Sequence, residues 1–207
     1  MTITLRTPSG LTTKPLVVKL GGSLYNHVPG LVPILRSSMC PLFIVPGGGP
    51  FTDAVRQAGL DDETAHWAAI AAMDRYGRYI ASHGLPITDR LVVPDQPVIF
   101  LSGRSLREQD PLPHSWDVTS DTIAAWTAAE LRLDLLLLKS VDGIMDGGIL
   151  QEHIDLPRET DVVDPLLISY VLEKQVDTFI INGSRPEFLI KYLRGDPVPG
   201  TRISTTF

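Results

Sequence analysis

The sequence lacks the features of disulfide-rich, membrane-spanning and secreted proteins. It holds one cysteine in 207 residues, Cys40, so an internal disulfide framework is excluded. No apolar run approaches the roughly 20 residues of a membrane span. The N-terminal stretch "MTITLRTPSGLTTKP" lacks the basic start and long apolar core of a signal peptide. We therefore expect a cytoplasmic protein with no membrane partner.

Positive charge is also scarce. The chain has 18 lysines and arginines against 24 acidic residues, for a formal net charge of −6. Binding to duplex nucleic acid depends largely on basic patches, so we expect no nucleic-acid partner. A local group of cations that binds one small anion remains compatible with this composition.

Apolar runs alternate with helical patterns along the whole chain. With 43% hydrophobic residues, the sequence can bury a substantial core. The runs are continuously apolar, which is typical of parallel strands covered on both faces. We predict strands at Leu16–Leu20, Leu42–Val45, Val98–Leu101, Asp134–Lys139 and Thr178–Ile181. We predict helices at Phe51–Ala58, Glu63–Ser82, Thr122–Arg132, Leu166–Lys174 and Pro186–Arg194. The alternation indicates an α/β fold with a mainly parallel central sheet.

Two long loops, Ser102–Thr119 and Ser140–Val162, leave the carboxyl ends of predicted strands. Ligands bind at this edge in open α/β sheets, and long loops in compact domains are often functional. The long helix before the first of these loops has a face of Ala, Ile and Met. That face suits either the core or a subunit contact.

Two glycine-rich segments each follow a predicted strand. The first is "KLGGS", with Lys19 inside an apolar run, and the second is "VPGGGPF", which leads into a helix. Glycine backbones and a helix N-terminus both present amides to an anion. A strand-end turn, with Lys19 reaching to solvent, is the alternative for the first segment, and a simple turn is the alternative for the second.

A third segment, "TSDTIAAWTAAELRLDLLLLKSVDGI", places Asp121 at a helix start and Lys139 at a strand end. Asp121 is favoured there by the helix dipole alone, and Thr119 or Ser120 can cap the helix. Alternatively, Asp121 is a carboxylate that orients two lysines, and the loop after Lys139 contacts a nucleotide.

Five segments in this order resemble the amino acid kinase superfamily. They are "VVKLGGSL", "IVPGGGPF", "TSDTIAAWTAAEL", "LLLKSVDGI" and "INGSRPEFLIKYLRGDPVPGTRI". The resemblance implies a three-layer αβα sandwich that forms one domain over residues 1–207. It implies an acceptor-binding lobe over about 1–115 and a nucleotide-binding lobe over about 116–207.

Within the superfamily, "ETAHWAAIAAMDRYGRYIAS" and "FIINGSRPEFL" resemble the kinase of methanofuran biosynthesis. The resemblance implies transfer of the ATP γ-phosphoryl group to [5-(aminomethyl)furan-3-yl]methyl phosphate. It also implies Mg²⁺ and a homo-oligomer. There are three alternatives: an isopentenyl phosphate kinase, another small-acceptor kinase, or a member that stores or senses a ligand without catalysis.

The superfamily pattern also implies roles for individual residues. Lys19 and Asp121 become catalytic, the first neutralising the transferred phosphoryl group and the second organising the lysines. The residues implied to hold the nucleotide are Gly21, Gly22, Ser23, Ser140, Val141, Asp142, Gly143 and Ile144. Those implied or suggested to contact the acceptor are Gly47, Gly48, Gly49, Asp53, His66 and Arg104. No side chain is predicted to ligate a metal directly.

The chain departs from the superfamily at one catalytic position. Many members carry a second catalytic lysine in a G-G-M-x-x-K segment, and here that region reads "TDVVDPLLISYVLEKQ". Lys139 is the predicted replacement, and Lys174 is a weaker one.

An aminomethyl group on the acceptor needs a carboxylate or a π-face. Asp53, Asp74 and Trp67 are the candidates. Packing roles for His66 and Trp67, and a helix-dipole role for Asp53, are the alternatives.

Overall fold

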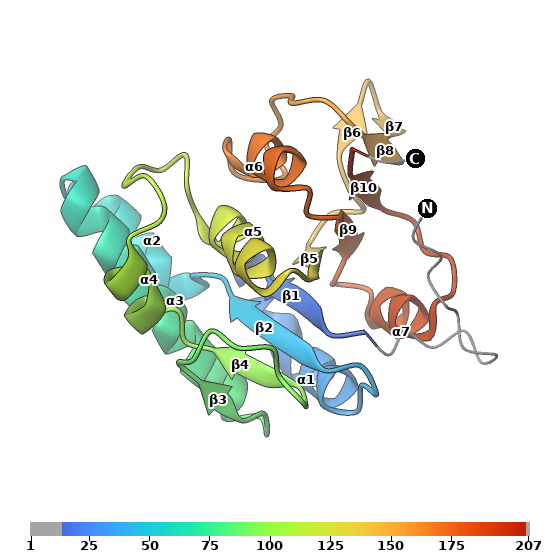
Figure 1. Cartoon of the computed structure of the whole chain (residues 1–207), viewed down its shortest axis with the longest axis horizontal. Coiled ribbons are helices and arrows are strands. Elements are labelled where there is room, and N and C mark those ends of the chain that lie inside the picture. The colour runs from blue at the N-terminus through green and yellow to red at the C-terminus, as the bar shows by residue number, and fades with distance from the viewer. Residues whose placement is uncertain (1–13, 206–207) are drawn as a thin grey trace.

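The computed structural model describes residues 14–205, so the N-terminal segment in which no signal peptide is expected lies outside it. An eight-stranded sheet has the order β3-β4-β2-β1-β5-β9-β10-β8, and only the β9–β10 pair is antiparallel (Figure 1). Its strands are β1 Leu16–Leu20, β2 Leu42–Pro46, β3 Ile87–Thr88, β4 Val98–Phe100, β5 Asp134–Lys139, β8 His153–Ile154, β9 Thr178–Asn182 and β10 Thr201–Ile203.

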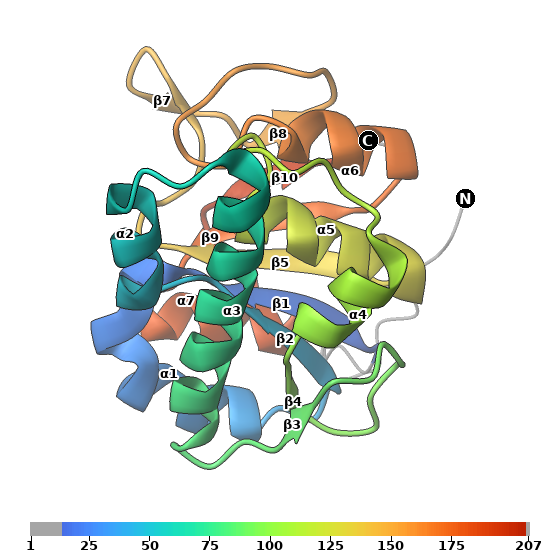
Figure 2. The same ribbon diagram turned by 90° about the vertical axis from the view of Figure 1, so that its left-hand side faces the viewer.

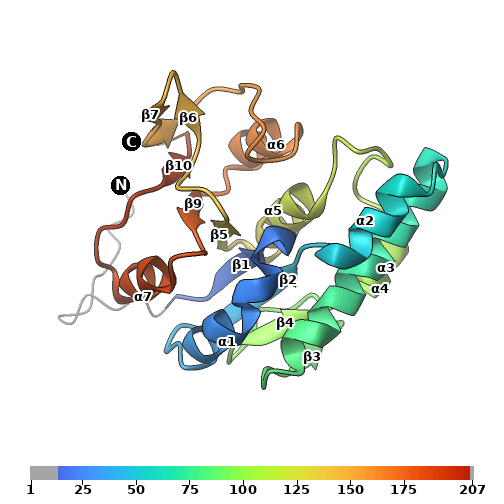
Figure 3. The same ribbon diagram turned by 180° about the vertical axis from the view of Figure 1, so that it is seen from behind.

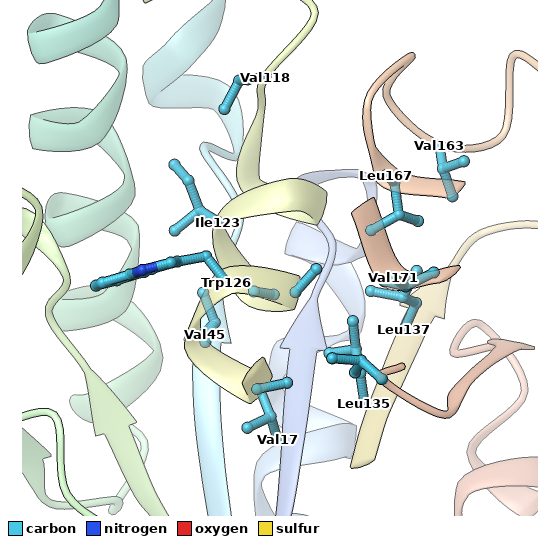
Figure 4. Packing of buried hydrophobic residues seen from close by; sticks show 14 of the residues in the cluster. Val17, Val45, Val118, Ile123, Trp126, Leu135, Leu137, Val163, Leu167 and Val171 are labelled. Carbon is cyan, nitrogen blue, oxygen red and sulfur yellow. The ribbon is translucent and has the colours of Figure 1, made fainter. Parts of the chain in front are cut away.

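Helices cover both faces of this sheet. α5 (Ser120–Leu131) and α6 (Leu167–Lys174) lie on one face, and α1 (Val28–Arg36) and α7 (Pro186–Arg194) lie on the other (Figure 1 and Figure 3). Successive strand residues point to opposite faces. Val17, Leu135 and Trp126 of α5 therefore belong to one core cluster (Figure 4), whereas Val18 joins the core under α1 and α7. The predicted αβα sandwich is confirmed.

The predicted elements occur close to their expected positions. β1, β5 and α7 have the predicted bounds, and the other predicted strands and helices differ by one or two residues at an end. α1 was not predicted: Gly30 and Pro33 lie inside its segment and disfavour helix, whereas Pro29 lies in the first turn, where proline is tolerated. It forms because Leu31, Leu35 and the rest of its apolar stripe are fully buried, and that burial outweighs local propensity.

Both predicted loops contain regular structure. The first holds α4 (Gly103–Gln109), so only residues 110–119 form a loop before α5. The second holds a small hairpin of β6 (Met145–Asp146) and β7 (Ile149–Leu150), and then the edge strand β8. Strands of two residues are too short to leave a periodic pattern in the sequence.

α3 (Asp62–Ala81) lies between α2 (Pro50–Gln57) and α4 (Figure 2). Its apolar face belongs to the core, since Ile70 and Met73 are 2% and 3% exposed. Gly77 lets it approach the sheet closely, because an added Cβ would lie 2.8 Å from Leu101 Cδ2. No helix within residues 14–205 is long and apolar enough to cross a membrane.

The start of α5 is held by Asp164, which lies 42 residues beyond Thr122 in the sequence. Thr119 is the N-cap residue, but its hydroxyl does not cap the helix and instead donates to Asp164 Oδ2 at 2.9 Å. The same carboxylate accepts from the backbone N–H groups of Thr119, Thr122 and Leu167, at 2.9 to 3.0 Å. The Thr122 hydroxyl donates to its other oxygen at 2.5 Å. Asp164 therefore joins the first turns of α5 and α6.

We predict that Asp164→Ala lowers the free energy of unfolding by about 3 to 5 kcal/mol, because three N–H groups near the buried carboxylate lose their acceptor. Urea denaturation measures this change. Asp161→Ala is the matched control, since Asp161 is exposed three residues earlier, and we expect a change within about 0.5 kcal/mol. Equal stability of the two variants would contradict the role of Asp164.

Candidate active site

A cavity of about 690 Å³ opens at the carboxyl ends of the central strands. Its walls come from both glycine segments, from the N-terminal half of α3, and from the segments that precede α5 and α6. This is the sheet edge at which parallel α/β proteins bind ligands.

Two lysines meet one buried aspartate at the base of this cavity. Lys19 Nζ lies 2.7 Å from Asp121 Oδ1, and Lys139 Nζ lies 2.6 Å from Asp121 Oδ2. The Asp121 side chain is 4% exposed, and those of Lys19 and Lys139 are 5% and 14% exposed. The predicted geometry, in which Asp121 orients two lysines, is present.

Strand register explains how the lysines converge. β1 and β5 are neighbouring parallel strands, and Lys19 is paired with Leu137. Lys139 lies two residues beyond Leu137, so its side chain points to the same face of the sheet as that of Lys19. α5 covers this face, and its first turn carries Asp121 between the two ammonium groups.

The electrostatics of the group follow from burial and from its charges. Burial alone would raise the pKa of Asp121, but the neighbouring Lys19 and Lys139 ammonium groups outweigh it, so the pKa lies below its ordinary value. Burial, reinforced by Lys19, lowers the pKa of Lys139 to about 8. Lys19, Lys139 and Asp121 together carry a net positive charge, which favours a bound polyanion beside the two ammonium groups. Asp164, a second buried carboxylate of the cavity lining, partly offsets this charge near Lys139.

The two glycine segments lie directly against one another. A Cβ on Gly22 would lie 2.5 Å from the Gly49 nitrogen, and a Cβ on Gly47 would lie 2.7 Å from the Gly22 nitrogen. Gly49 also has φ +55°, a left-handed backbone conformation that favours glycine. These glycines are therefore required for close backbone packing, and the same packing brings Gly21, Gly22, Gly48 and Gly49 to the cavity wall.

Most of the predicted site residues line this cavity. They are Lys19, Gly21, Gly22, Ser23, Gly48, Gly49, Asp53, His66, Asp121 and Lys139. Gly47 lies just behind the wall, where its N–H donates to Leu20 O at 2.8 Å. The segment Ser140–Ile144 follows Lys139 but is not part of the lining. It is held instead by β9 and β10, through Asn182 Nδ2 donating to Asp142 Oδ1 at 2.9 Å and Ile144 N–H donating to Thr201 Oγ1 at 2.8 Å.

Arg104 lies elsewhere, contrary to its suggested place beside the acceptor. Its guanidinium pairs with Asp89 at 3.3 Å and with Glu108 at 2.9 Å, and it lines a separate outer cavity between α3 and α4. Sequence alone could not place it, because Arg104 follows a strand end but α4 carries its side chain outward.

Three other candidates are also outside the main cavity. Asp74 lines the outer cavity and accepts from Gly103 N–H at 3.3 Å. Trp67 donates from Nε1 to Glu63 at 2.7 Å. Lys174 is paired with Glu173 at the exposed end of α6. None of the three faces Asp121.

Sequence reasoning missed several residues of the cavity wall. Asp62, Arg56 and Trp116 line its outer part, and the Arg56 guanidinium lies 5.3 Å from the centre of the Trp116 ring. The deeper wall beside α3 is apolar and includes Ala65, Ala69, Ile70, Met73, Val118 and Ile123. Trp116 lies two positions before "VTSD", and an aromatic residue so close to that motif was the available sequence signal. Only the fold brings Trp116 opposite α2.

The cavity therefore combines three environments. Its base is cationic, its middle is apolar, and its rim carries Asp53, Asp62 and Asp161 with Arg56 and His66. It suits a small molecule with an anionic end, an apolar body and a polar end near the rim. Within the described part of the chain, no group of three or more His, Cys, Asp or Glu side chains is arranged to hold a metal ion.

Comparison with known proteins places this geometry in context. No protein-family model matches the chain. The sequence is 28% identical over 203 residues to the [5-(aminomethyl)furan-3-yl]methyl phosphate kinase of Methanocaldococcus jannaschii, covering 86% of this chain and 93% of that one.

Solved kinase structures share the fold. A UMP kinase from Ureaplasma parvum has a TM-score of 0.69 and 19% identity, covering 94% of this chain and all of that one. An isopentenyl phosphate kinase has a TM-score of 0.60 and 17% identity, covering 91% of this chain and all of that one. The chain therefore has an amino acid kinase-like fold.

Proposed function

We propose that this protein is an ATP-dependent kinase whose acceptor is a small phosphate monoester, [5-(aminomethyl)furan-3-yl]methyl phosphate, and whose product is the diphosphate. The observation that carries the proposal is the buried Lys19–Asp121–Lys139 group beneath two apposed glycine segments. The similarity to a kinase named for this acceptor over 86% of the chain supports the choice of substrate.

The two sides of the cavity suggest where each substrate binds. We assign the ATP phosphates to Gly21–Ser23 and Lys139 at the cavity, and the nucleoside to the adjoining Ser140–Ile144 segment outside its lining, within the lobe arrangement implied by the superfamily. We assign the acceptor phosphate to Gly48 and Gly49, at the N-terminus of α2, where unpaired amides and the helix dipole favour an anion. The acceptor lobe then covers about residues 1–115 and the nucleotide lobe about residues 116–207. We expect the enzyme to be a cytoplasmic homo-oligomer.

Phosphoryl transfer depends on in-line positioning and on neutralisation of the equatorial oxygens. Lys19 and Lys139 supply fixed positive charges, and the carboxylate of Asp121 holds both in place before substrate arrives. A phosphate acceptor is already anionic near neutral pH, so no general base is needed. Mg²⁺ would add neutralising charge and be held mainly by the phosphates of ATP, since the described residues offer no cage of their own.

The cavity rim favours an acceptor that carries a cation. Asp53 and Asp62 are exposed at the rim. The Arg56 guanidinium lies 3.8 Å from Asp53 and 5.3 Å from the centre of the Trp116 ring, so Asp62 is the rim carboxylate that we assign to a cation of the acceptor. An ammonium group on the acceptor would be attracted to the Asp62 carboxylate. The apolar wall beside α3 suits a furan ring, but it would also suit the chain of isopentenyl phosphate, which remains the second candidate acceptor.

The acceptor is tested by measuring ATP consumption with the aminomethylfuran phosphate, isopentenyl phosphate and carbamate. We expect the furan to give the highest kcat/KM, and Asp62→Asn to raise its KM about tenfold by removing a charged partner of the ammonium group. The KM for isopentenyl phosphate is the internal control and should change little. Turnover of isopentenyl phosphate without turnover of the furan would favour the second candidate. ATP binding with no transfer to any acceptor would favour a sensing or storage protein.

Lys19→Ala should lower kcat by several orders of magnitude while ATP affinity falls far less, because Lys19 is proposed to act mainly on charge in the transition state. Steady-state kinetics and calorimetric ATP titration separate the two effects. Lys174→Ala is the matched control, since Lys174 is exposed and distant from Asp121. Equal losses of kcat and affinity would make Lys19 a ground-state anchor instead.

Titration of Lys139 should lower the kcat/KM of the reaction at alkaline pH. Its pKa in the free protein is about 8, and a lysine is charged below its pKa. We therefore expect kcat/KM for ATP to be constant below this pH and to fall as the pH rises through it. Lys139→Arg, which keeps its charge, should remove the decline. An unchanged profile in a folded Lys139→Arg variant would assign the decline to another group.

A further inference from the structure

A cluster of polar and aromatic side chains joins the segment before α5 to the N-terminal half of α3. His114 is at its centre, and its side chain is 19% exposed. Its Nδ1 lies against the Glu63 carboxylate of α3, and its Nε2 lies 2.7 Å from Asp110 Oδ1, at the end of α4. The mechanism proposed above uses none of these three groups.

Aromatic contacts surround the same imidazole. The His66 ring is stacked on the His114 ring, with centroids 4.0 Å apart and planes at 20°. Trp67 meets His114 edge-on at 5.2 Å, and its Nε1 donates to Glu63 at 2.7 Å. Arg107 of α4 lies over the Trp67 ring at 4.6 Å. The charged or titratable groups packed around His114 are therefore Glu63 and His66 of α3, Arg107 of α4, and Asp110.

The contacts of the two His114 ring nitrogens define the protonation state of this side chain. A carboxylate only accepts hydrogen bonds, so both imidazole nitrogens must carry hydrogen to satisfy both partners, and only the imidazolium does so. The two carboxylates, Glu63 first, raise the pKa of His114 above its ordinary value. Burial and then the charge of His114 lower the pKa of His66, so a neutral ring is stacked on a charged one.

The cluster borders the proposed acceptor side of the cavity. His66 lines the cavity, and so do Ser115, Trp116, Val118 and Thr119, which immediately follow His114. Residues 110–119 contain no helix or strand. Val118 N–H donates to Ser115 O at 3.2 Å, and Asp117 N–H donates to Ser115 Oγ at 3.2 Å, so these residues form a local turn. His114 contributes the side-chain contacts that join this turn to α3.

We propose that His114, as an imidazolium bridging Glu63 and Asp110, latches the Ser115–Thr119 wall against α3 and so is a positioning residue for the phosphoryl acceptor. This inference rests on the proposed kinase function for its kinetic consequence. Loss of the proton removes one of the two donors and leaves a carboxylate facing a lone pair. The wall that carries Trp116 then loosens, while Lys19, Asp121 and Lys139 keep their contacts.

The kinetic test compares His114→Gln with the wild type across pH. At about pH 6 the acceptor KM of the variant should be about two- to fivefold higher, the ratio expected for ion pairs with largely exposed carboxylates, and should approach that of the wild type near pH 9. The KM for ATP should be unchanged. The variant and the wild type are compared at the same pH. Titration of the acceptor phosphate and of Lys139 therefore affects both KM values equally and cancels in their ratio. His83→Gln, beyond the far end of α3, is the matched control and should leave the acceptor KM unchanged.

A second measurement does not depend on kinase activity. Amide hydrogen exchange of residues 110–119 should be faster in His114→Gln than in the wild type at about pH 6 and similar near pH 9, and Glu63→Gln should give an intermediate effect. Chemical shifts of the ring should show that the pKa of His114 lies above the ordinary value of a histidine side chain.

Unchanged exchange in a folded His114→Gln variant, or equal KM ratios at all pH values, would overturn the latch. Failure of the protein to phosphorylate any acceptor would instead overturn the proposed function, and the exchange result would still decide the latch.

Discussion

The charge balance at Asp121 is the constraint on which the rest of the site depends. Two ammonium groups and one carboxylate are almost fully removed from water, and the three side chains carry a net positive charge. Removing one partner from such a group is costly, whereas the complete group is stabilised by its short contacts. An anion that enters the cavity completes the neutralisation. The protein without substrate thus already holds its ammonium groups in place to bind a chain of phosphates.

The fold meets this constraint through long-range contacts. Neighbouring parallel strands bring Lys19 and Lys139 to one face of the sheet, and the first turn of α5 supplies Asp121. Asp164 fixes that turn from a separate segment, through bonds to two of its N–H groups and to the start of α6. The stability of α5 and the position of the Asp121 carboxylate are therefore coupled in one hydrogen-bond network.

Lys139 is our proposed replacement for the lysine of the missing G-G-M-x-x-K motif. The region that would carry it supplies Asp164, a buried helix cap, and the second ammonium group comes from the end of β5. Charge neutralisation depends on where an ammonium group lies and not on which element carries it. The acceptor side has a different design, in which an apolar wall, a carboxylate rim and the His114 cluster come from α3 and the segment before α5.

The sequence by itself determined the features that depend on local pattern. Continuous apolar runs predicted the central strands, glycines after two of them predicted the paired loops, and Asp121 and Lys139 were identified at element ends. The tertiary structure alone decided the contacts between distant segments. Arg104 turns outward on α4, and α1 forms despite the interior Pro33. Asp164 caps a helix 42 residues earlier in the chain, and Trp116 and His114 reach α2 and α3. Such contacts have no periodic signature, because they depend on how elements pack and not on the order of residues within them.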